Sequence, residues 1–531
     1  MGTRVEHQLL YRRQFIMGPR SVALSGWKTL DIDGKHYLTI HPDLQFEQTT
    51  INNGIQLTLL GYIIDPYHPN ETNMMILNRL QDNLSSFEEL TKRSEPYGGR
   101  WIIIHRDNCG VRLFHDPCGL RQIHYMDTEE GLWCASQAIR LAEILNIKED
   151  NDASMQQFMH SPQFESEERA WAGEGSPYKG INHLIPNHYL DLNRVTVHRY
   201  WPYENLKPLA IKEAVVEAAA LLRGSVESIA QRYKVMIPVT AGWESRSLLA
   251  ASKNIKNKVY YYIGKHEHLS DESQDVRVPA KLLKRLGLEY HVDECKEEMD
   301  ESFKNIYNRN VTMARHLPKS LIIYRHYKHT QDRINICGIC SEIAKKCVYT
   351  HHYARHITPE LLAKVFKYKN MEYPTAIYAR WLEQTEDIAK RSKINIFDLF
   401  YWEMRMGNWG AMYAAEQDIA VEEFCPFNNR KLLTILLSVP EKYRIPPNFT
   451  LYREIVKSLW EQTLIEPVNP PTLKSLAKRV YRGVRRNTLY ITTYWQRKPN
   501  YQKYQLTKMA IHAAGRMKAD GSQEISGNYY L

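Results

Sequence analysis

The chain has 531 residues, of which 43% are hydrophobic and 24% are charged. These fractions are typical of a folded globular protein, and they argue against a mostly disordered chain or a fibrous repeat. No apolar run approaches the roughly 18 residues that a membrane-spanning helix needs, and the first residues lack the apolar core of a signal peptide, so we expect a cytoplasmic protein without a membrane span.

The net charge of +10 is concentrated towards the C-terminus. Residues 468–519 contain twelve Lys and Arg residues and no Asp or Glu, so the rest of the chain is close to neutral. Such a basic segment can contact phosphate, nucleic acid or another anionic surface. Because aromatic residues such as Tyr481 and Trp495 are interleaved with the charges, a helical face packed on the rest of the protein is the preferred interpretation. A nucleic-acid partner is not expected.

The first 200 residues are predicted to be rich in β-strands. Residues 56–64, 100–105 and 111–114 are short runs of strand-forming side chains bounded by turn residues. Asn108-Cys109-Gly110 predicts a hairpin between the last two runs, and a second hairpin is predicted around Asn193-Arg194. Residues 74–84 and 136–145 are predicted to be helical.

From residue 211 onward, predicted helices and strands alternate. The helices are expected at 211–233, 245–252 and 273–286, and the strands at 234–239, 258–263, 289–292 and 333–337. Alternation of this kind is typical of a doubly wound parallel sheet, so the fold class is α/β. Beyond residue 357 the pattern is mostly helical. A domain boundary is predicted near residues 201–207, where prolines interrupt a polar stretch.

The segment Val235-Met-Ile-Pro-Val-Thr-Ala-Gly-Trp-Glu-Ser-Arg246 places a buried strand, a short loop and a helix start in succession. This geometry aims backbone N–H groups and the positive end of a helix at one point, which suits a phosphate. Hydroxyl groups would come from Thr240 and Ser245, and Glu244 could hold a Mg²⁺ ion that bridges phosphate oxygens. The segment is not a Walker A loop. The alternative is an ordinary strand–turn–helix connection in which Glu244 is only a favourable charge at the helix start.

Soft metal ligands follow the strand predicted at 333–337. A CxxC pair with further thiol and imidazole groups nearby could bind zinc or act in redox chemistry, although the spacing is irregular for a zinc site. A buried strand end is the preferred interpretation. The residues concerned are Cys337, Cys340, Cys347, His351, His352 and His356.

Thr240-Ala-Gly-Trp-Glu-Ser245 resembles the S-G-G-x-D-S pyrophosphate loop of the asparagine synthetase family, whose members cleave ATP to AMP and pyrophosphate. Three further segments lie in the family's order: Asp275, Ala280, Leu286-Gly287 and His291 resemble its D-x-x-x-A-x-x-L-A-x-x-L-G-x-x-H-H stretch, residues 338–342 stand at its G-E-G-S-D segment, and Cys425-Pro-Phe-Asn-Asn-Arg-Lys-Leu432 resembles its R-x-P-F-L-D-x-x-L.

In the first part of the chain, residues 99–107, 116–119, 133–136 and 181–201 resemble the family's glutaminase-like domain. The resemblance implies a glutaminase-like, Ntn-type α+β sandwich over residues 1–203. It implies a PP-loop synthetase domain with a helical C-terminal part over residues 204–480, and a basic tail over residues 481–531.

The family's glutaminase uses a cysteine that becomes the N-terminal residue, so that its free amine and thiol act together. Here Met1 is followed by Gly2, and the first cysteine is Cys109. A cysteine in mid-chain has no α-amino group, so we predict that the domain does not hydrolyse glutamine. The nitrogen would then come from ammonia or from a substrate amine, as in relatives such as β-lactam synthetase and lasso-peptide cyclases.

Three positions depart from the family's synthetase motifs. Glu244 and Glu342 replace two metal-holding aspartates and keep their charge, so the resemblance still implies Mg²⁺. Ile339 stands where the family has an acidic residue that handles the acceptor, so the acceptor pocket should differ. Glu403 and Tyr349 are substitute bases, and a structural role is preferred for each.

The resemblance implies an ATP-dependent, AMP-forming C–N ligase that adenylates a small-molecule or peptide carboxylate. A homodimer is a possible assembly. Two alternatives stay open, namely a PP-loop enzyme that adenylates RNA and a non-catalytic relative. The implied ATP site consists of Thr240, Ala241, Gly242, Trp243, Ser245, Ile263, Gly264 and Gly338, with Glu244 and Glu342 on Mg²⁺ and Lys474, or failing that Lys478, at the developing oxyanion.

Overall fold

The computed structural model describes residues 8–315, 319–345 and 356–470. Two units are distinguished, Met1–Asn469 and Pro470–Leu531, and the description below concerns the first. The predicted tail at 481–531 lies outside the described residues, as do Lys474, Lys478, Cys347, Tyr349, His351 and His352.

The first 200 residues form two six-stranded antiparallel sheets. One sheet has the order β10-β8-β9-β1-β3-β2 and the other β12-β11-β7-β6-β5-β4. The strands of the first sheet are β1 (Phe15–Gly18), β2 (Lys28–Asp31), β3 (Tyr37–Ile40), β8 (His124–Thr128), β9 (Gly131–Ala135) and β10 (Asn182–His183). Those of the second are β4 (Phe46–Gln48), β5 (Gln56–Ile64), β6 (Gly98–Asp107), β7 (Gly110–His115), β11 (His188–Asp191) and β12 (Thr196–Arg199).

The two antiparallel sheets face each other across one apolar cluster. Met17 and Leu38 of the first sheet share this cluster with Leu60 and Ile102 of the second. Leu59, the neighbour of Leu60, belongs to a different cluster that includes helical side chains, because successive residues of a strand point to opposite faces. Each sheet is therefore covered by helices on its outer face. These helices and those that follow are α2 (Asn73–Gln81), α3 (Phe87–Arg93), α4 (Ala138–Leu145), α5 (Ala153–Met159) and α6 (Pro162–Ser166).

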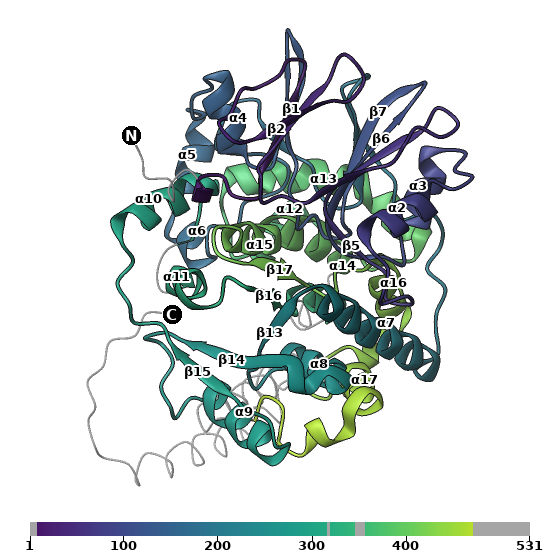
Figure 1. The fold of residues 1–531 in the computed structure, drawn as a ribbon. Helices are drawn as coiled ribbons and strands as arrows, with labels where there is room; N and C mark the ends of the chain where they lie inside the picture. The colour runs from purple at the N-terminus through teal and green to yellow at the C-terminus, as the bar shows by residue number, and fades with distance from the viewer. Residues whose placement is uncertain (1–7, 316–318, 346–355, 471–531) are drawn as a thin grey trace, which may run out of the picture. The chain divides into compact units, whose positions relative to one another are not determined.

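A five-stranded parallel sheet follows, with the order β15-β14-β13-β16-β17. The chain first runs outward from β13 through β14 to β15 and then returns to the other side of β13 with β16 (Figure 1). The strand order therefore reverses between β13 and β16, and ligands of open α/β sheets bind at the carboxyl ends of strands at such a point. The strands are β13 (Lys234–Pro238), β14 (Val259–Lys265), β15 (His291–Glu294), β16 (Arg333–Ile336) and β17 (Glu422–Phe424).

Helices surround this sheet and make up most of the rest of the chain (Figure 1). Those that accompany the sheet are α7 (Ile211–Arg232), α8 (Trp243–Ala251), α9 (Gln274–Arg285), α10 (Glu301–Asn310) and α11 (Lys319–His329). The later helices are α12 (Pro359–Val365), α13 (Glu372–Ser392), α14 (Ile396–Phe400), a π-helical stretch at Tyr401–Gly410, α15 (Ala411–Gln417), α16 (Arg430–Ser438) and α17 (Thr450–Trp460). Short 3₁₀ helices occur at Lys253–Lys258, Ile339–Ala344, Glu441–Tyr443 and Glu461–Leu464.

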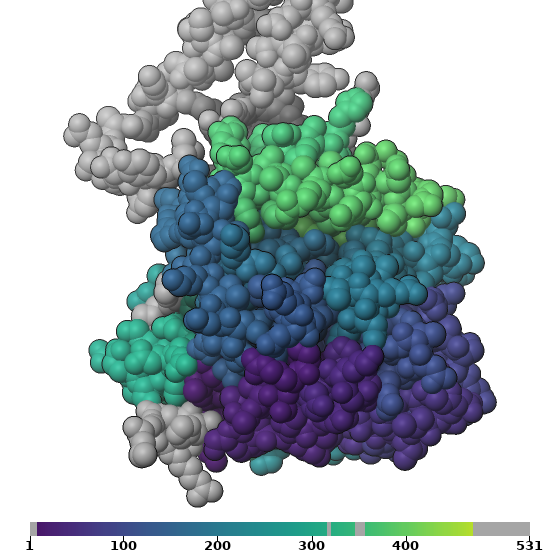
Figure 2. Space-filling model, turned by 90° about the horizontal axis from the view of Figure 1, so that it is seen from above, coloured from purple at the N-terminus to yellow at the C-terminus, as the bar shows by residue number. Residues whose placement is uncertain are grey.

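The later helices pack directly on the first part of the chain. Phe158 of α5 stacks on Tyr373 of α13 with their ring centroids 5.4 Å apart, and the two segments border each other on the surface shown in Figure 2, in blue and green. Among the residues that the structure describes, no helix combines the length and the apolar character that crossing a bilayer requires.

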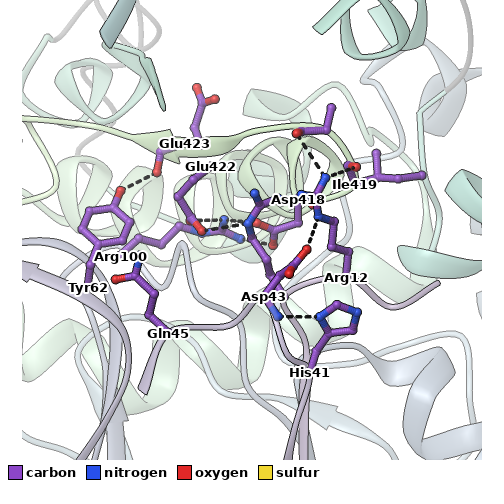
Figure 3. A network of polar contacts seen from close by, with 12 residues as sticks. Arg12, His41, Asp43, Gln45, Tyr62, Arg100, Asp418, Ile419, Glu422 and Glu423 are labelled. Carbon is purple, nitrogen blue, oxygen red and sulfur yellow. Dashed lines mark hydrogen bonds and ion pairs between the residues drawn. The ribbon is translucent and has the colours of Figure 1, made fainter. Parts of the chain in front are cut away.

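A buried network of charges connects the second antiparallel sheet with the parallel sheet (Figure 3). Arg100 of β6 donates to both carboxylate oxygens of Asp418, at 2.6 and 2.7 Å, and to Glu422 at 3.0 Å. Arg121 donates to the same oxygen of Glu422 at 2.9 Å. Next to these contacts, the hydroxyl of Tyr62 donates to the backbone carbonyl of Glu423 at 2.6 Å.

The mixed α/β fold with a parallel sheet confirms the predicted fold class at that level. Most of the predicted elements lie near their expected bounds, and strand 56–64 is β5. The glutaminase-like, Ntn-type assignment stays a prediction. The boundary near residue 203 also stays a prediction, although one large apolar cluster includes residues from both sides of it, such as Tyr62 and Ile237.

Candidate functional site

The loop between β13 and α8 is fixed by its own hydrogen bonds and by two neighbouring segments. The Oγ of Ser245 accepts from the backbone N–H of Thr240 at 3.1 Å, and the Oγ1 of Thr240 accepts from the N–H of Gly242 at 3.3 Å. The N–H of Ala241 donates to Asp275 of α9 at 3.0 Å. The two hydroxyl groups therefore close the loop.

Helix α8 begins at Trp243, directly after this loop. Its N-cap residue is Gly242, in an extended conformation, and no side chain caps the helix within the described residues. The first N–H groups of an α-helix have no partner within the helix, and together with the helix dipole they favour an anion. The start of α8 thus offers donors at the carboxyl end of β13, where the strand order reverses.

The loop after β16 reaches the same place. A Cβ atom added to Gly338 would lie 2.8 Å from the Cβ of Glu244, which is closer than side chains approach, so only glycine allows this contact. The 3₁₀ helix Ile339–Ala344 follows and carries Glu342, and Lys345 comes directly after it.

Glu244 and Glu342 converge on one cation, the ammonium group of Lys345. The Nζ of Lys345 contacts the Oε1 of Glu244 and lies 2.6 Å from the Oε1 of Glu342. The side chain of Lys345 is 6% exposed, whereas those of Glu244 and Glu342 are 28% and 24% exposed. The three charges form a cluster that is closed at the lysine and open at the carboxylates.

Two carboxylates are suitable ligands for Mg²⁺, which binds to proteins through one or two carboxylates and keeps several waters. In this structure, however, the oxygen that each glutamate directs towards its partner is already bound to the ammonium of Lys345. A second cation at the same oxygens would be repelled by that ammonium. The arrangement therefore does not fit a resident Mg²⁺ ion, and the metal role of Glu244 and Glu342 stays a prediction.

The segment after α17 is attached to the phosphate-type loop. Arg246 of α8 is buried and donates to the backbone carbonyls of Thr463 at 2.6 Å, Glu466 at 2.8 Å and Pro467 at 3.2 Å. Burial lowers the pKa of Arg246 to about 10. The N–H of Asn469, five residues before Lys474 in the sequence, donates to the carbonyl of Ala241 at 2.9 Å.

Ile263 and Gly264, the predicted adenine contacts, lie on the strand next to the loop. Tyr262 of β14 pairs with Pro238 of β13, so the two residues that follow it stand beside the loop. Ile263 is buried, and a Cβ atom on Gly264 would be 3.1 Å from Ile322 of α11. Helix α11 therefore covers one side of Gly264, and an adenine ring would have to lie on another side.

Glu403, one of the substitute bases, is buried away from this cluster. Its carboxylate accepts from Arg199 at 2.8 Å, from Asn187 at 2.8 Å and from Trp381 at 2.7 Å. Burial acts to raise its pKa, but the charge and hydrogen bonds of Arg199 outweigh burial and lower it. An ionised carboxylate with all these donors is a structural group.

The cysteines after β16 form a different cluster from the one that the sequence suggested. The thiols of Cys337 and Cys340 both form hydrogen bonds with that of Cys425, and Cys340 also contacts Cys118. All four are buried, and burial together with the neighbouring thiols raises the pKa of Cys340 well above its usual value. His356 is exposed. The buried strand end, which was the preferred interpretation, matches this environment.

The described cysteines of the first 200 residues do not resemble activated nucleophiles. Cys109 is exposed in the turn between β6 and β7, while Cys118 and Cys134 are buried and burial raises the pKa of both thiols. All three lie within the chain and therefore lack an α-amino group.

The sequence analysis missed Lys345, Arg246 and Asn469. Lys345 follows Glu342 by three residues, and opposite charges at this spacing lie on one face of a helical turn, so the pair could have been found from the sequence. The contact of Lys345 with Glu244 depends on tertiary structure. The same is true of the carbonyls that Arg246 binds, which no local pattern indicates.

No family model matches the chain, and no curated protein matches it. Solved structures that resemble it include a glutamine phosphoribosylpyrophosphate amidotransferase from B. subtilis complexed with ADP and GMP, at 12% identity over 54% of this chain and 67% of that one, with a TM-score of 0.21. An allosteric regulatory enzyme of purine biosynthesis has 13% identity, coverage of 54% and 66%, and a TM-score of 0.21. A glutamine-dependent NAD⁺ synthetase from Acinetobacter baumannii in complex with ADP has 11% identity, coverage of 50% and 58%, and a TM-score of 0.17. At these TM-scores the likeness carries no argument about fold or activity.

Proposed function

We propose that this chain is an ATP-dependent ligase that adenylates a carboxylate, releases pyrophosphate and forms an amide with ammonia or a substrate amine. The observation that supports this most strongly is the meeting of two loops at the reversal point of the parallel sheet. One loop brings the uncapped start of α8, and the other brings Glu342 and Lys345 to Glu244.

In the proposed reaction an oxygen of the substrate carboxylate attacks the α-phosphorus of ATP. The new O–P bond forms as the bond between the α-phosphorus and the bridging oxygen breaks, and pyrophosphate leaves. The N–H groups at the start of α8 would bind the pyrophosphate, because they are oriented before the reaction and need not reorganise as charge develops.

The second half of the reaction converts the acyl-adenylate into an amide. The amine attacks the carbonyl carbon, the C–O bond to the phosphate breaks, AMP leaves and the nitrogen loses a proton. Since the described cysteines offer no N-terminal thiol, the amine is proposed to come from solution or from the substrate. The segment that leads towards Lys474 is held at the loop by Arg246 and Asn469, which supports an oxyanion role for Lys474.

The test is exchange of labelled pyrophosphate into ATP by the full-length chain across a panel of carboxylates. Exchange is expected with a subset of the panel, and Glu244→Ala should abolish it while the circular dichroism spectrum stays unchanged. Lys234→Met is a matched control, because Lys234 and Asp332 form an exposed pair 2.9 Å apart at the opposite ends of the same two strands.

Three outcomes would contradict parts of the proposal. Unchanged exchange in Glu244→Ala would remove the role of that residue. Failure of the chain to bind ATP at millimolar concentration would indicate a non-catalytic relative. Formation of AMP only when RNA is added would indicate an RNA-modifying enzyme.

A further inference from the structure

We propose that Lys345 is a built-in cation that excludes divalent metal ions from Glu244 and Glu342 in the ligand-free chain. Because the cluster belongs to the pyrophosphate site, the biological meaning of this exclusion rests on the proposed function. The exclusion itself is a property of three side chains and can be measured without any reaction.

The ammonium group lies on the carboxylate oxygens that a bridging metal would use. Its Nζ contacts the Oε1 of Glu244 and lies 2.6 Å from the Oε1 of Glu342. Two carboxylates that point at each other without a cation would repel, so a positive charge is needed to hold this arrangement. Lys345 supplies one charge where a metal would supply two, and it cannot leave the chain.

The position of Lys345 is set by packing and by the backbone. Its N–H donates to the carbonyl of Glu342 at 3.1 Å, which places it one turn after that residue. Its Nζ lies 5.9 Å from the ring centroid of Tyr452, and the hydroxyl of Tyr452 donates to the carbonyl of Ser341 at 2.6 Å. Helix α17 therefore fixes the 3₁₀ turn that carries the lysine.

The burial of the three side chains differs in a way that matters for metal binding. Lys345 is 6% exposed, so its charge is screened little by solvent, whereas about a quarter of each glutamate is open. A metal ion could therefore reach the glutamates, but it would meet the ammonium at close range.

Removal of the ammonium should create a divalent site. We would titrate Mn²⁺ into the full-length chain without nucleotide and measure binding by electron paramagnetic resonance and calorimetry. Wild type is expected to show no site that depends on Glu244. Lys345→Met, which keeps the length of the side chain, should bind one additional Mn²⁺ at least about tenfold more tightly.

Matched variants separate this effect from general changes in charge. Lys345→Arg keeps the positive charge and should gain no site, and Lys234→Met removes an exposed lysine and should also gain none. The double variant Glu244→Gln/Lys345→Met should lose the site that Lys345→Met creates. Circular dichroism and thermal melting of each variant report whether it is folded.

Either of two results would overturn the proposal: Mn²⁺ binding by wild type that Glu244→Gln removes, or a folded Lys345→Met variant without an additional Mn²⁺ site. If Lys345→Met does not fold, the wild-type and Glu244→Gln titrations still decide. Absence of pyrophosphate exchange in wild type would contradict the proposed function and leave the Mn²⁺ result intact, so the two failures are distinguishable.

Discussion

Two clusters of charge lie at opposite ends of the parallel sheet and use the same chemical groups for different ends. At the amino end of β17, Arg100 and Arg121 are each 2% exposed and bind Asp418 and Glu422. At the carboxyl ends of β13 and β16, Lys345 binds Glu244 and Glu342, whose side chains stay about a quarter exposed.

The difference between the clusters lies in geometry and access. Arg100 binds Asp418 through two parallel hydrogen bonds, and a planar guanidinium in a buried site has little freedom to exchange partners. The ammonium of Lys345 is a point charge on a flexible stem beside carboxylates that solvent can reach. The first cluster is suited to joining two sheets and the second to exchanging a partner with a ligand.

The largest effect is expected from breaking the amino-end cluster. Arg100→Met would leave Asp418 and Glu422 buried without their main partner and should lower the free energy of unfolding by about 3–5 kcal/mol. Urea denaturation measures this loss. Arg20→Met is the matched control, because the pair of Arg20 with Glu130 is more than half exposed on both sides and should be worth at most about 1 kcal/mol. Equal losses in the two variants would contradict the structural role of the network.

A smaller effect is expected from Arg246, on the carboxyl-end side. Arg246→Met would leave the carbonyls of Thr463, Glu466 and Pro467 without their donor and should cost about 1–3 kcal/mol. Hydrogen exchange should show faster exchange of the N–H of Asn469, while Arg277→Met, which loses only an exposed pair with Glu272, should not change it. Unchanged exchange at Asn469 would show that Arg246 does not hold this segment.

Glu423 sharpens the comparison, since it follows Glu422 but has no cation. Burial raises the pKa of Glu423 to about 8, with Asn335 donating to both of its oxygens at 2.9 and 3.1 Å. An unfolded glutamate has a pKa near 4.3, so the folded state binds the extra proton between these values. Stability from this group is therefore complete below about pH 4 and is lost as the pH rises through about 8, at on the order of 1 kcal/mol per pH unit.

The variant Glu423→Gln should remove this dependence, because an amide does not titrate. Denaturation of wild type and variant between pH 5 and 8 should give curves that diverge as the pH rises, with the variant gaining relative to wild type. Parallel curves would show that Glu423 titrates normally in the folded protein.

The smallest effect is expected at Cys109, far from both clusters in chemistry. Cys109→Ser should change the free energy of unfolding by no more than about 0.5 kcal/mol, because the residue is exposed in a turn. Among the described cysteines it should be the first to react with iodoacetamide. A loss of pyrophosphate exchange in this variant would give Cys109 a role that the structure does not indicate.

The comparison also shows how far the sequence predicts such a molecule. Strand 56–64 and helix 211–232 carry strong local patterns, and both were predicted almost to the residue. The three-residue strand β17 was missed, because its pairing with β16 is a long-range contact. Likewise, the motifs placed Glu244 and Glu342 near each other in the predicted site, whereas the cation between them depends on how the 3₁₀ turn packs on Tyr452.

The close approach of Gly338 to Glu244 gives these positions a signature that can be followed through other sequences. The contact requires a glycine, with a carboxylate four residues later and a lysine three residues after that. If the lysine substitutes for a metal, the two should replace each other during evolution. Chains that keep the glycine but lack the lysine should then carry the shorter aspartates typical of a metal site, and natural variation would act as a mutagenesis experiment already performed.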